Sequence, residues 1–213
     1  MAFEGWEAEA LEFFDGLEAD NSKAYWERHK AEYGSLVRAP MEALVEELSP
    51  KTGGKIFRPY RDVRFSKDKS PYKTNIAAMV DDGYVQLTAH GLGAGAGMWE
   101  MAPDQIERYR EAVDRNVSGT KLERIVTDIR DEEILVSGHG ELKTVPRGYP
   151  KDHARAELLR CKGLTAWRDW SPGPWLGTAK SKDRLVEFFS ATRPLRRWLD
   201  TNVGRSELPE QRR

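Results

Sequence analysis

Apolar side chains recur every three or four positions over the first fifty residues, which indicates helices. The first helix carries its apolar positions on one face: Trp6, Ala10, Phe13, Phe14 and Leu17. The triplet at 20–22, Asp-Asn-Ser, offers side chains that cap a helix N-terminus, so a second helix is predicted to follow it. Pro40 should either kink this second helix or begin a new one.

The middle of the chain changes to strand-like patterns. Residues 56–65 predict a strand that is interrupted at Pro59. Residues 75–80 and 84–90 flank Asp81-Asp82-Gly83, a turn signal of the hairpin kind. These segments together predict an antiparallel meander.

One face of the predicted strand 84–90 is polar. Val85, Leu87 and Ala89 alternate with Gln86, Thr88 and His90, so His90 is placed where it can line a pocket. The following glycine-rich segment 92–101 is predicted to extend the sheet. Its glycines look like a phosphate-binding loop, but such a loop opens a helix directly after a strand, which this segment does not.

Helical patterns return in the second half of the chain. One helix is predicted to begin at Pro103, and a further helical stripe covers residues 122–129. Two more helices are predicted over 152–161 and 182–199, with Pro194 as a kink or break in the last. Short strands are predicted at 134–136 and 141–145. The sum is an α+β protein whose central, mostly antiparallel sheet is flanked by N-terminal and C-terminal helices. We expect a single domain over residues 1–200 and a flexible tail over 201–213.

Composition narrows the functional classes. The 213 residues carry a net charge of −1, which disfavours a globally basic nucleic-acid-binding protein. A single cysteine excludes an internal disulfide framework and a cysteine-based zinc site, and the four scattered histidines suggest no metal ligand set. No cofactor is therefore predicted. The chain shows neither a long apolar run nor a signal-peptide pattern, so we expect a cytoplasmic protein with no membrane partner.

Charge is distributed unevenly, and this points to one candidate site. Residues 1–50 hold twelve acidic and four basic side chains, whereas residues 58–73 hold six basic and two acidic ones. The basic segment is rich in groups that bind phosphate, sulfate or carboxylate. The predicted ligand-binding residues are Arg61, Arg64, Ser66, Lys67, Lys69, Tyr72, Lys73 and Trp99. Asp62 is the candidate to orient an arginine or to act as a general base.

Three hypotheses fit this segment. The favoured one is a site for a small anionic ligand, with or without catalysis. The second is a nucleic-acid-binding module in which the same cations contact phosphates and Tyr72 or Trp99 stacks on a base. The third is a structural loop in which Asp62 and Asp68 pair with their basic neighbours. The sequence names neither a ligand nor an oligomeric state.

Residues 61–74, R-D-V-R-F-S-K-D-K-S-P-Y-K-T, resemble the hallmark of a bacterial and fungal family catalogued as domain of unknown function 2461. Three other stretches resemble it too: residues 13–29, the glycine-rich segment 93–99 and residues 142–162. The likeness extends to about residue 200. It implies a single α+β domain and supports the basic segment as a candidate surface, but it implies no activity, substrate or cofactor.

Overall fold

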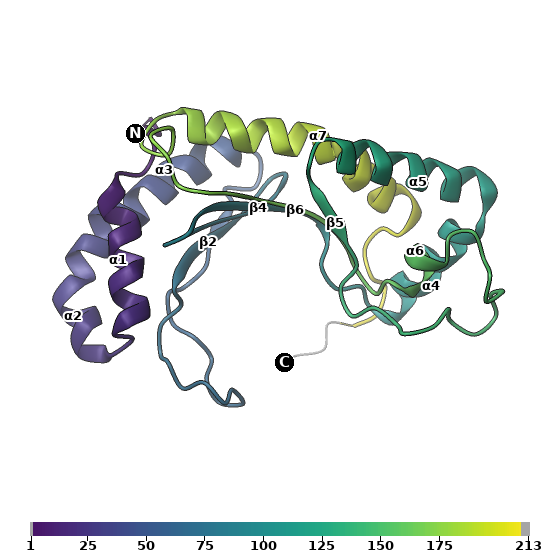
Figure 1. Ribbon diagram of the computed structural model, residues 1–213, viewed down its shortest axis with the longest axis horizontal. Helices are drawn as coiled ribbons and strands as arrows, with labels where there is room; N and C mark the ends of the chain where they lie inside the picture. Colours follow the sequence, from purple (N-terminus) through teal and green to yellow (C-terminus); the bar gives the residue numbers. More distant parts are fainter. Residues whose placement is uncertain (1, 210–213) are drawn as a thin grey trace. The chain divides into compact units, whose positions relative to one another are not determined.

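The computed structural model describes residues 2–209, in which helices accompany one six-stranded sheet (Figure 1). The helical segments are α1 (Ala8–Ala19), α2 (Lys23–Glu32), the π-helix η1 (Tyr33–Arg38), α3 (Ala39–Leu48), α4 (Pro103–Asp114), α5 (Asn116–Asp131), α6 (Ala156–Arg160) and α7 (Lys180–Asn202). The strands are β1 (Lys55–Ile56), β2 (Asn75–Val80), β3 (Gly83–Thr88), β4 (Gly91–Met98), β5 (Leu135–Ser137) and β6 (Leu164–Trp170), in the order β1-β2-β3-β4-β6-β5. The predicted α+β class, with a central antiparallel sheet between N-terminal and C-terminal helices, is confirmed.

The chain divides into two compact units. The N-terminal unit contains the residues up to 94 together with 169–188, and the C-terminal unit contains 95–168 together with the residues from 189 onward. Strands β4 and β6 each supply residues to both units. The basic segment, residues 58–73, belongs to the N-terminal unit.

The helices of the N-terminal unit follow the predicted pattern. The apolar face of α1 is buried through Ala10, Leu11, Phe13, Phe14 and Leu17. Ser22 caps α2, since its side chain accepts a 3.1 Å hydrogen bond from the Tyr25 amide. Pro40 lies in the first turn of α3, where its missing N–H has no helical partner to lose, so it begins a helix rather than breaking one.

Strands β2 and β3 form the predicted hairpin. Val80 pairs with Gly83 across the turn at Asp81-Asp82. Ile76, Ala78, Val85 and Leu87 are buried on the face against which α1 and α3 pack. The opposite face carries Asn75, Gln86 and Thr88, which are half-buried. The sheet in this unit therefore has one apolar face and one polar face.

The glycine-rich segment is strand β4, as predicted. Gly91 has a φ of +121°, and a Cβ there would lie 2.1 Å from the Trp170 carbonyl oxygen. The glycine is thus required for close approach of two backbones, which is a structural task and not a phosphate-binding one.

Two sequence-based predictions of strands were wrong. The strand predicted over 56–65 is limited to β1, because Pro59 donates no hydrogen bond and the chain leaves the sheet there. No strand forms over 141–145; the partner of β5 is instead β6, which the sequence analysis missed. Of the kink or break predicted at Pro194, the break does not occur: helix α7 continues through it, since burial of Leu195, Trp198 and Leu199 outweighs one lost helical hydrogen bond.

Part of the segment predicted to be a flexible tail contacts α4. Gln105 donates a 2.7 Å hydrogen bond to the Gly204 carbonyl, and Arg108 donates one of 2.7 Å to the Val203 carbonyl. Ser206 donates to Asp104 at 2.7 Å. Residues 210–213 of that segment lie outside the described residues.

Candidate anion-binding groove

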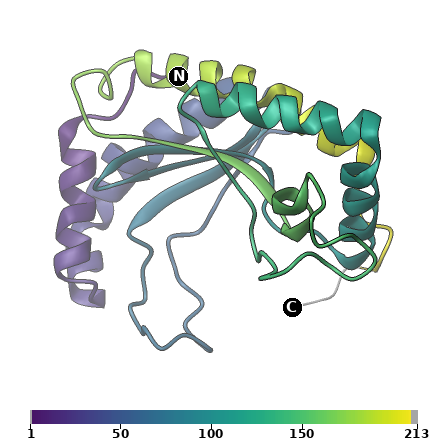
Figure 2. The same ribbon diagram turned by 45° about the vertical axis from the view of Figure 1, so that its right-hand side comes forward.

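The basic segment forms a long two-armed loop between β1 and β2, here called the basic loop (residues 57–74). It extends away from the strands it connects, as Figures 1 and 2 both show. Its two arms pair near their base: the Arg61 amide donates to the Pro71 carbonyl at 2.8 Å, and the Lys73 amide donates to the Pro59 carbonyl at 2.8 Å. Between these two hydrogen bonds, Tyr60 and Tyr72 lie opposite each other as an antiparallel pair.

The base of the basic loop is attached to the helices by Asn21 and Trp26. The Asn21 side chain accepts from the Tyr72 amide at 3.0 Å and donates to the Tyr72 carbonyl at 3.1 Å, which copies the pairing of a neighbouring strand. The Tyr72 ring stacks on Trp26 with centroids 4.5 Å apart and planes 10° apart. Only 4% of Tyr72 is exposed, so its ring acts mainly as an anchor.

Two ion pairs brace the outer part of the basic loop. Arg61 pairs with Asp68, whose carboxylate also accepts from the side chain and amide of Ser70 at 2.6 and 2.9 Å. Arg64 Nε and Nη2 donate to Asp62 at 2.9 and 2.7 Å. The ion pairs expected under the structural hypothesis are present, and both acidic residues of the segment, Asp62 and Asp68, take part in them.

These contacts change the acidity of Asp62. Hydrogen bonds from the Arg64 side chain and amide lower the pKa of Asp62 to about 2. A carboxylate whose pKa is this low is a weak base, so it accepts a proton poorly at neutral pH. The geometry therefore favours the orienting role for Asp62 over the role of general base.

The acidity of Asp62 gives a first prediction. Because its pKa is depressed in the fold, the Asp62–Arg64 pair should stay intact as the pH falls below the ordinary value of 3.8 and break only near pH 2. A carboxyl carbon NMR titration should show this midpoint, and Arg64→Ala should move it back toward 3.8. A midpoint near 3.8 in the unsubstituted protein would show that the pair is not formed in solution.

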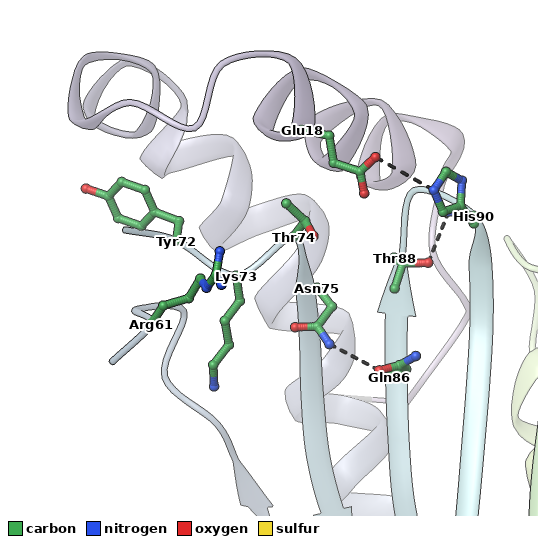
Figure 3. A pocket seen from close by; sticks show the side chains of 9 residues that line it. All are labelled: Glu18, Arg61, Tyr72, Lys73, Thr74, Asn75, Gln86, Thr88 and His90. Carbon is green, nitrogen blue, oxygen red and sulfur yellow. Dashed lines mark hydrogen bonds and ion pairs between the residues drawn. The ribbon is translucent and has the colours of Figure 1, made fainter. Parts of the chain in front are cut away.

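An open groove of about 390 Å³ lies between the basic loop, the polar face of β2 and β3, and the end of α1 (Figure 3). It is lined by Glu18, Arg61, Tyr72, Lys73, Thr74, Asn75, Gln86, Thr88 and His90. On its floor, Gln86 Oε1 accepts from Asn75 Nδ2 at 3.1 Å and from the Tyr84 hydroxyl at 3.2 Å. Both bonds end on Gln86 Oε1, so neither uses the amide N–H donors of this side chain.

Lys73 is the most distinctive group in the groove. No carboxylate among residues 2–209 lies within ion-pair distance of its ammonium group, which sits 5.5 Å from the centre of the Phe57 ring. Burial, and secondarily the positive charge of Arg58, lower the pKa of Lys73 below 10.5. The structure thus keeps a half-buried cation without an anionic partner, an arrangement that costs stability.

The structure separates the predicted site residues into three groups. Arg61, Tyr72 and Lys73 line the groove. Arg64, Ser66, Lys67 and Lys69 belong to the outer part of the basic loop and are not among the lining residues; Lys69 donates to the Val63 carbonyl at 2.9 Å. Trp99 belongs to the C-terminal unit, where its exposed ring stacks on His139 with centroids 4.1 Å apart.

Glu18, Thr74 and Asn75 also line the groove, although none of them was predicted to bind a ligand. No local signal marks Glu18, because only the packing of α1 brings it there. The alternation predicted over residues 84–90 did indicate a polar face with Gln86, Thr88 and His90, and all three residues line the groove.

Other chemistry has little support among residues 2–209. That part of the chain contains no group of three or more His, Cys, Asp or Glu side chains arranged to hold a metal ion. Cys161 is buried, and burial raises the pKa of its thiol to about 11, which makes it a poor nucleophile. None of the described helices has the length and apolar character needed to cross a membrane.

A family model described as conserved hypothetical protein (DUF2461) matches residues 9–198, nearly the whole described chain. The chain belongs to this family. The match includes the basic loop and all nine residues of the groove, so the resemblance noted for residues 61–74 is confirmed across the fold. Comparisons with curated proteins and with solved structures give no match. The DUF2461 description names no activity, so the chemistry must be argued from the groove.

Proposed function

We propose that this DUF2461 protein binds a small anionic ligand, carrying a phosphate or carboxylate group, in the groove beside the basic loop. The observation that carries the proposal is the half-buried Lys73 ammonium group, which has no carboxylate partner among residues 2–209. A bound anion would supply the missing countercharge and so relieve the cost of burying that cation.

The surroundings of Lys73 support the same conclusion. Arg61 also lines the groove, and its pairing with Asp68 restricts the guanidinium to one region instead of leaving it to move freely. Asn75, Gln86 and Thr88 add hydrogen-bonding groups along the floor. A cation with neutral polar neighbours suits a small, hydrogen-bonding anion better than an apolar molecule.

Lys73→Ala should weaken binding of inorganic phosphate, sugar phosphates or carboxylates by roughly 10- to 100-fold, the loss expected for one hydrogen bond to a charged group. Isothermal titration calorimetry measures this directly. Binding should also weaken as the pH rises through the lowered pKa of Lys73, because the neutral amine no longer attracts the anion.

Without ligand, the Lys73→Met variant should melt at a higher temperature than the unsubstituted protein, since the substitution removes the cost of burying the charge.

Lys67→Ala is the matched control. Lys67 is an exposed lysine of the same basic loop that does not line the groove, so its removal changes the net charge equally but should leave the affinity within about twofold. Equal losses in the two variants would mean that the ligand responds to the net charge of the loop and not to the groove.

Nucleic-acid binding is the second candidate function, and Phe65 is the observation that favours it. This side chain is 95% exposed near the tip of the basic loop, with the Arg64 guanidinium 5.8 Å from its ring centre. A single-stranded oligonucleotide in the same titrations separates the two functions. Binding that falls steeply with salt and is lost in Phe65→Ala, but not in Lys73→Ala, would favour the nucleic acid.

A further inference from the structure

The charges of the groove are arranged with opposite signs on two sides. Arg61 and Lys73 come from the basic loop on one side, whereas Glu18 projects from the last turn of α1 on the other (Figure 3). Glu18 Oε2 lies 3.7 Å from His90 Nε2, which is beyond the range of a good hydrogen bond. The Glu18 side chain is 36% exposed and that of His90 is 81% exposed, so Glu18 has no strong partner there.

A ligand with only an anionic group would satisfy one side of this groove and not the other. Its negative charge would be drawn to Lys73 and repelled by Glu18. A molecule that also carries an ammonium group would place a positive charge near Glu18, where it gains the attraction that the distant His90 contact does not provide. Between the two sides, Asn75 and Gln86 are held by hydrogen bonds and offer polar contacts to the connecting atoms.

We propose that the groove is specific for a small zwitterion, with its phosphate or carboxylate at Lys73 and Arg61 and a primary ammonium group at Glu18. This inference rests on the proposed anion binding and adds the second recognition element. Glu18 acts here as the residue that discriminates between ligands, while Lys73 supplies the affinity common to all anions.

The test uses pairs of probes that differ only in the amine. Each ω-aminoalkyl phosphate with two to six carbons is compared with the alkyl phosphate of the same length, and ω-amino carboxylates are compared with simple carboxylates in the same way. Titration calorimetry on the full chain should show that one length binds about fivefold tighter in its amino form, as expected for one ion pair at a partly exposed site. The two series distinguish a phosphate ligand from a carboxylate ligand.

Substitutions assign the preference to its residue. Glu18→Gln should abolish the preference while leaving the affinity for the alkyl phosphate equal or higher. Glu12→Gln is the matched control, because Glu12 is an exposed glutamate on α1 outside the groove, and it should keep the full preference. Lys73→Ala should weaken both members of every pair.

The outcomes separate the two proposals. If alkyl phosphates bind and Lys73→Ala abolishes this binding, but no amino form is preferred at any length, the zwitterion inference is wrong and the anion site stands. A preference that persists in Glu18→Gln also overturns it. If no probe binds, inorganic phosphate included, the anion site itself is wrong.

Discussion

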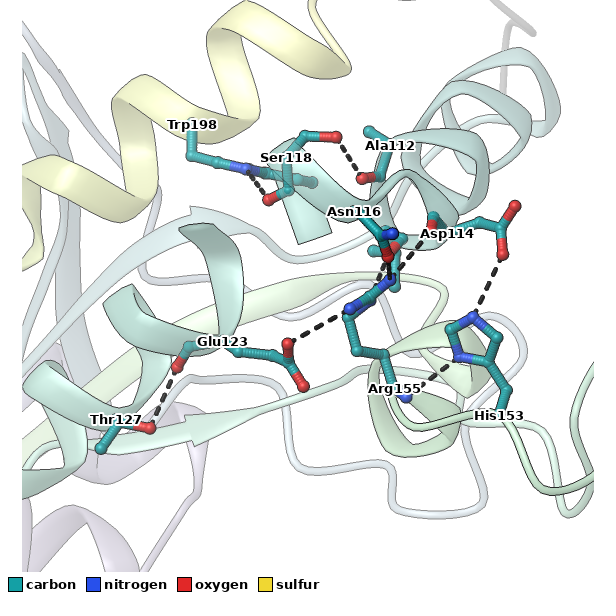
Figure 4. A network of polar contacts seen from close by, with 10 residues as sticks. Ala112, Asp114, Asn116, Ser118, Glu123, Thr127, His153, Arg155 and Trp198 are labelled. Atoms are coloured by element: carbon teal, nitrogen blue, oxygen red, sulfur yellow. Dashed lines mark hydrogen bonds and ion pairs between the residues drawn. The ribbon is translucent and has the colours of Figure 1, made fainter. Parts of the chain in front are cut away.

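Arg155→Ala is expected to destabilise the protein by about 3–5 kcal/mol, the cost of removing one partner from a buried ionic network. Only 8% of Arg155 is exposed, and its guanidinium joins α4 to α5 in the C-terminal unit (Figure 4). It donates to the Val113 carbonyl at 2.6 Å, to the Asp114 carbonyl at 2.8 Å and to Glu123 at 3.4 Å. Those carbonyls end α4 and have no helical partner, so without Arg155 they would be buried and unsatisfied.

Thermal unfolding measures this loss. A change of 3–5 kcal/mol corresponds to a fall in melting temperature of roughly 6–20 °C for a chain of this size. Arg155→Lys should recover little of it, because an ammonium group lacks the planar fork that reaches several acceptors at once.

Two further substitutions make the explanation specific to this network. Arg124→Ala, at an exposed arginine of α5, should change the melting temperature by less than about 2 °C. Gly119→Ala would place a Cβ 2.1 Å from the Val113 carbonyl oxygen and 2.5 Å from Arg155 Nε, so it should destabilise although alanine normally favours a helix. If Arg155→Ala melted like Arg124→Ala, the network would not be formed in solution.

Trp26→Ala is expected to cost about 3–5 kcal/mol, the usual range for truncating a buried tryptophan. Trp26 is 2% exposed and stacks on Tyr72, and its ring also lies 4.9 Å from that of Tyr33. Because Tyr72 is the anchor of the basic loop, the same substitution should displace Arg61 and Lys73. We therefore expect loss of anion binding even at temperatures where the protein remains folded.

Denaturant unfolding and calorimetry on the same variant test the two effects. Trp99→Ala is the control, since Trp99 is 63% exposed and belongs to the other unit; it should cost less than about 1 kcal/mol and leave anion affinity unchanged. This control also tests the sequence-based prediction that Trp99 binds the ligand. Folded Trp26→Ala that binds phosphate with full affinity would contradict the anchoring role of the stack.

Predictions of single helices and hairpins were confirmed where apolar residues recur with one clear period. The buried face of α1, the Ser22 cap and the β2–β3 hairpin all follow from neighbouring residues, which set helix and turn preferences directly. Strand β6 was missed because its partner β5 lies about thirty residues earlier, and the tryptophans at 167 and 170 did not by themselves indicate a strand. Pairing between distant segments leaves no local pattern to read.

The candidate site likewise combines features that one segment predicts with features that depend on distant segments. The family, the density of cations over residues 58–73 and the polar face of β3 could all be predicted beforehand, because they are properties of residue type and of alternation along one segment. Only the packed fold selects which of these cations line the groove: Arg61 and Lys73. It buried Tyr72 against Trp26, brought Glu18 of α1 to the groove beside the basic loop, and left Lys73 without a carboxylate partner among residues 2–209. The Tyr72–Trp26 stack and the approach of Glu18 to the groove each join segments far apart in the chain, and folding alone sets the distances between such segments.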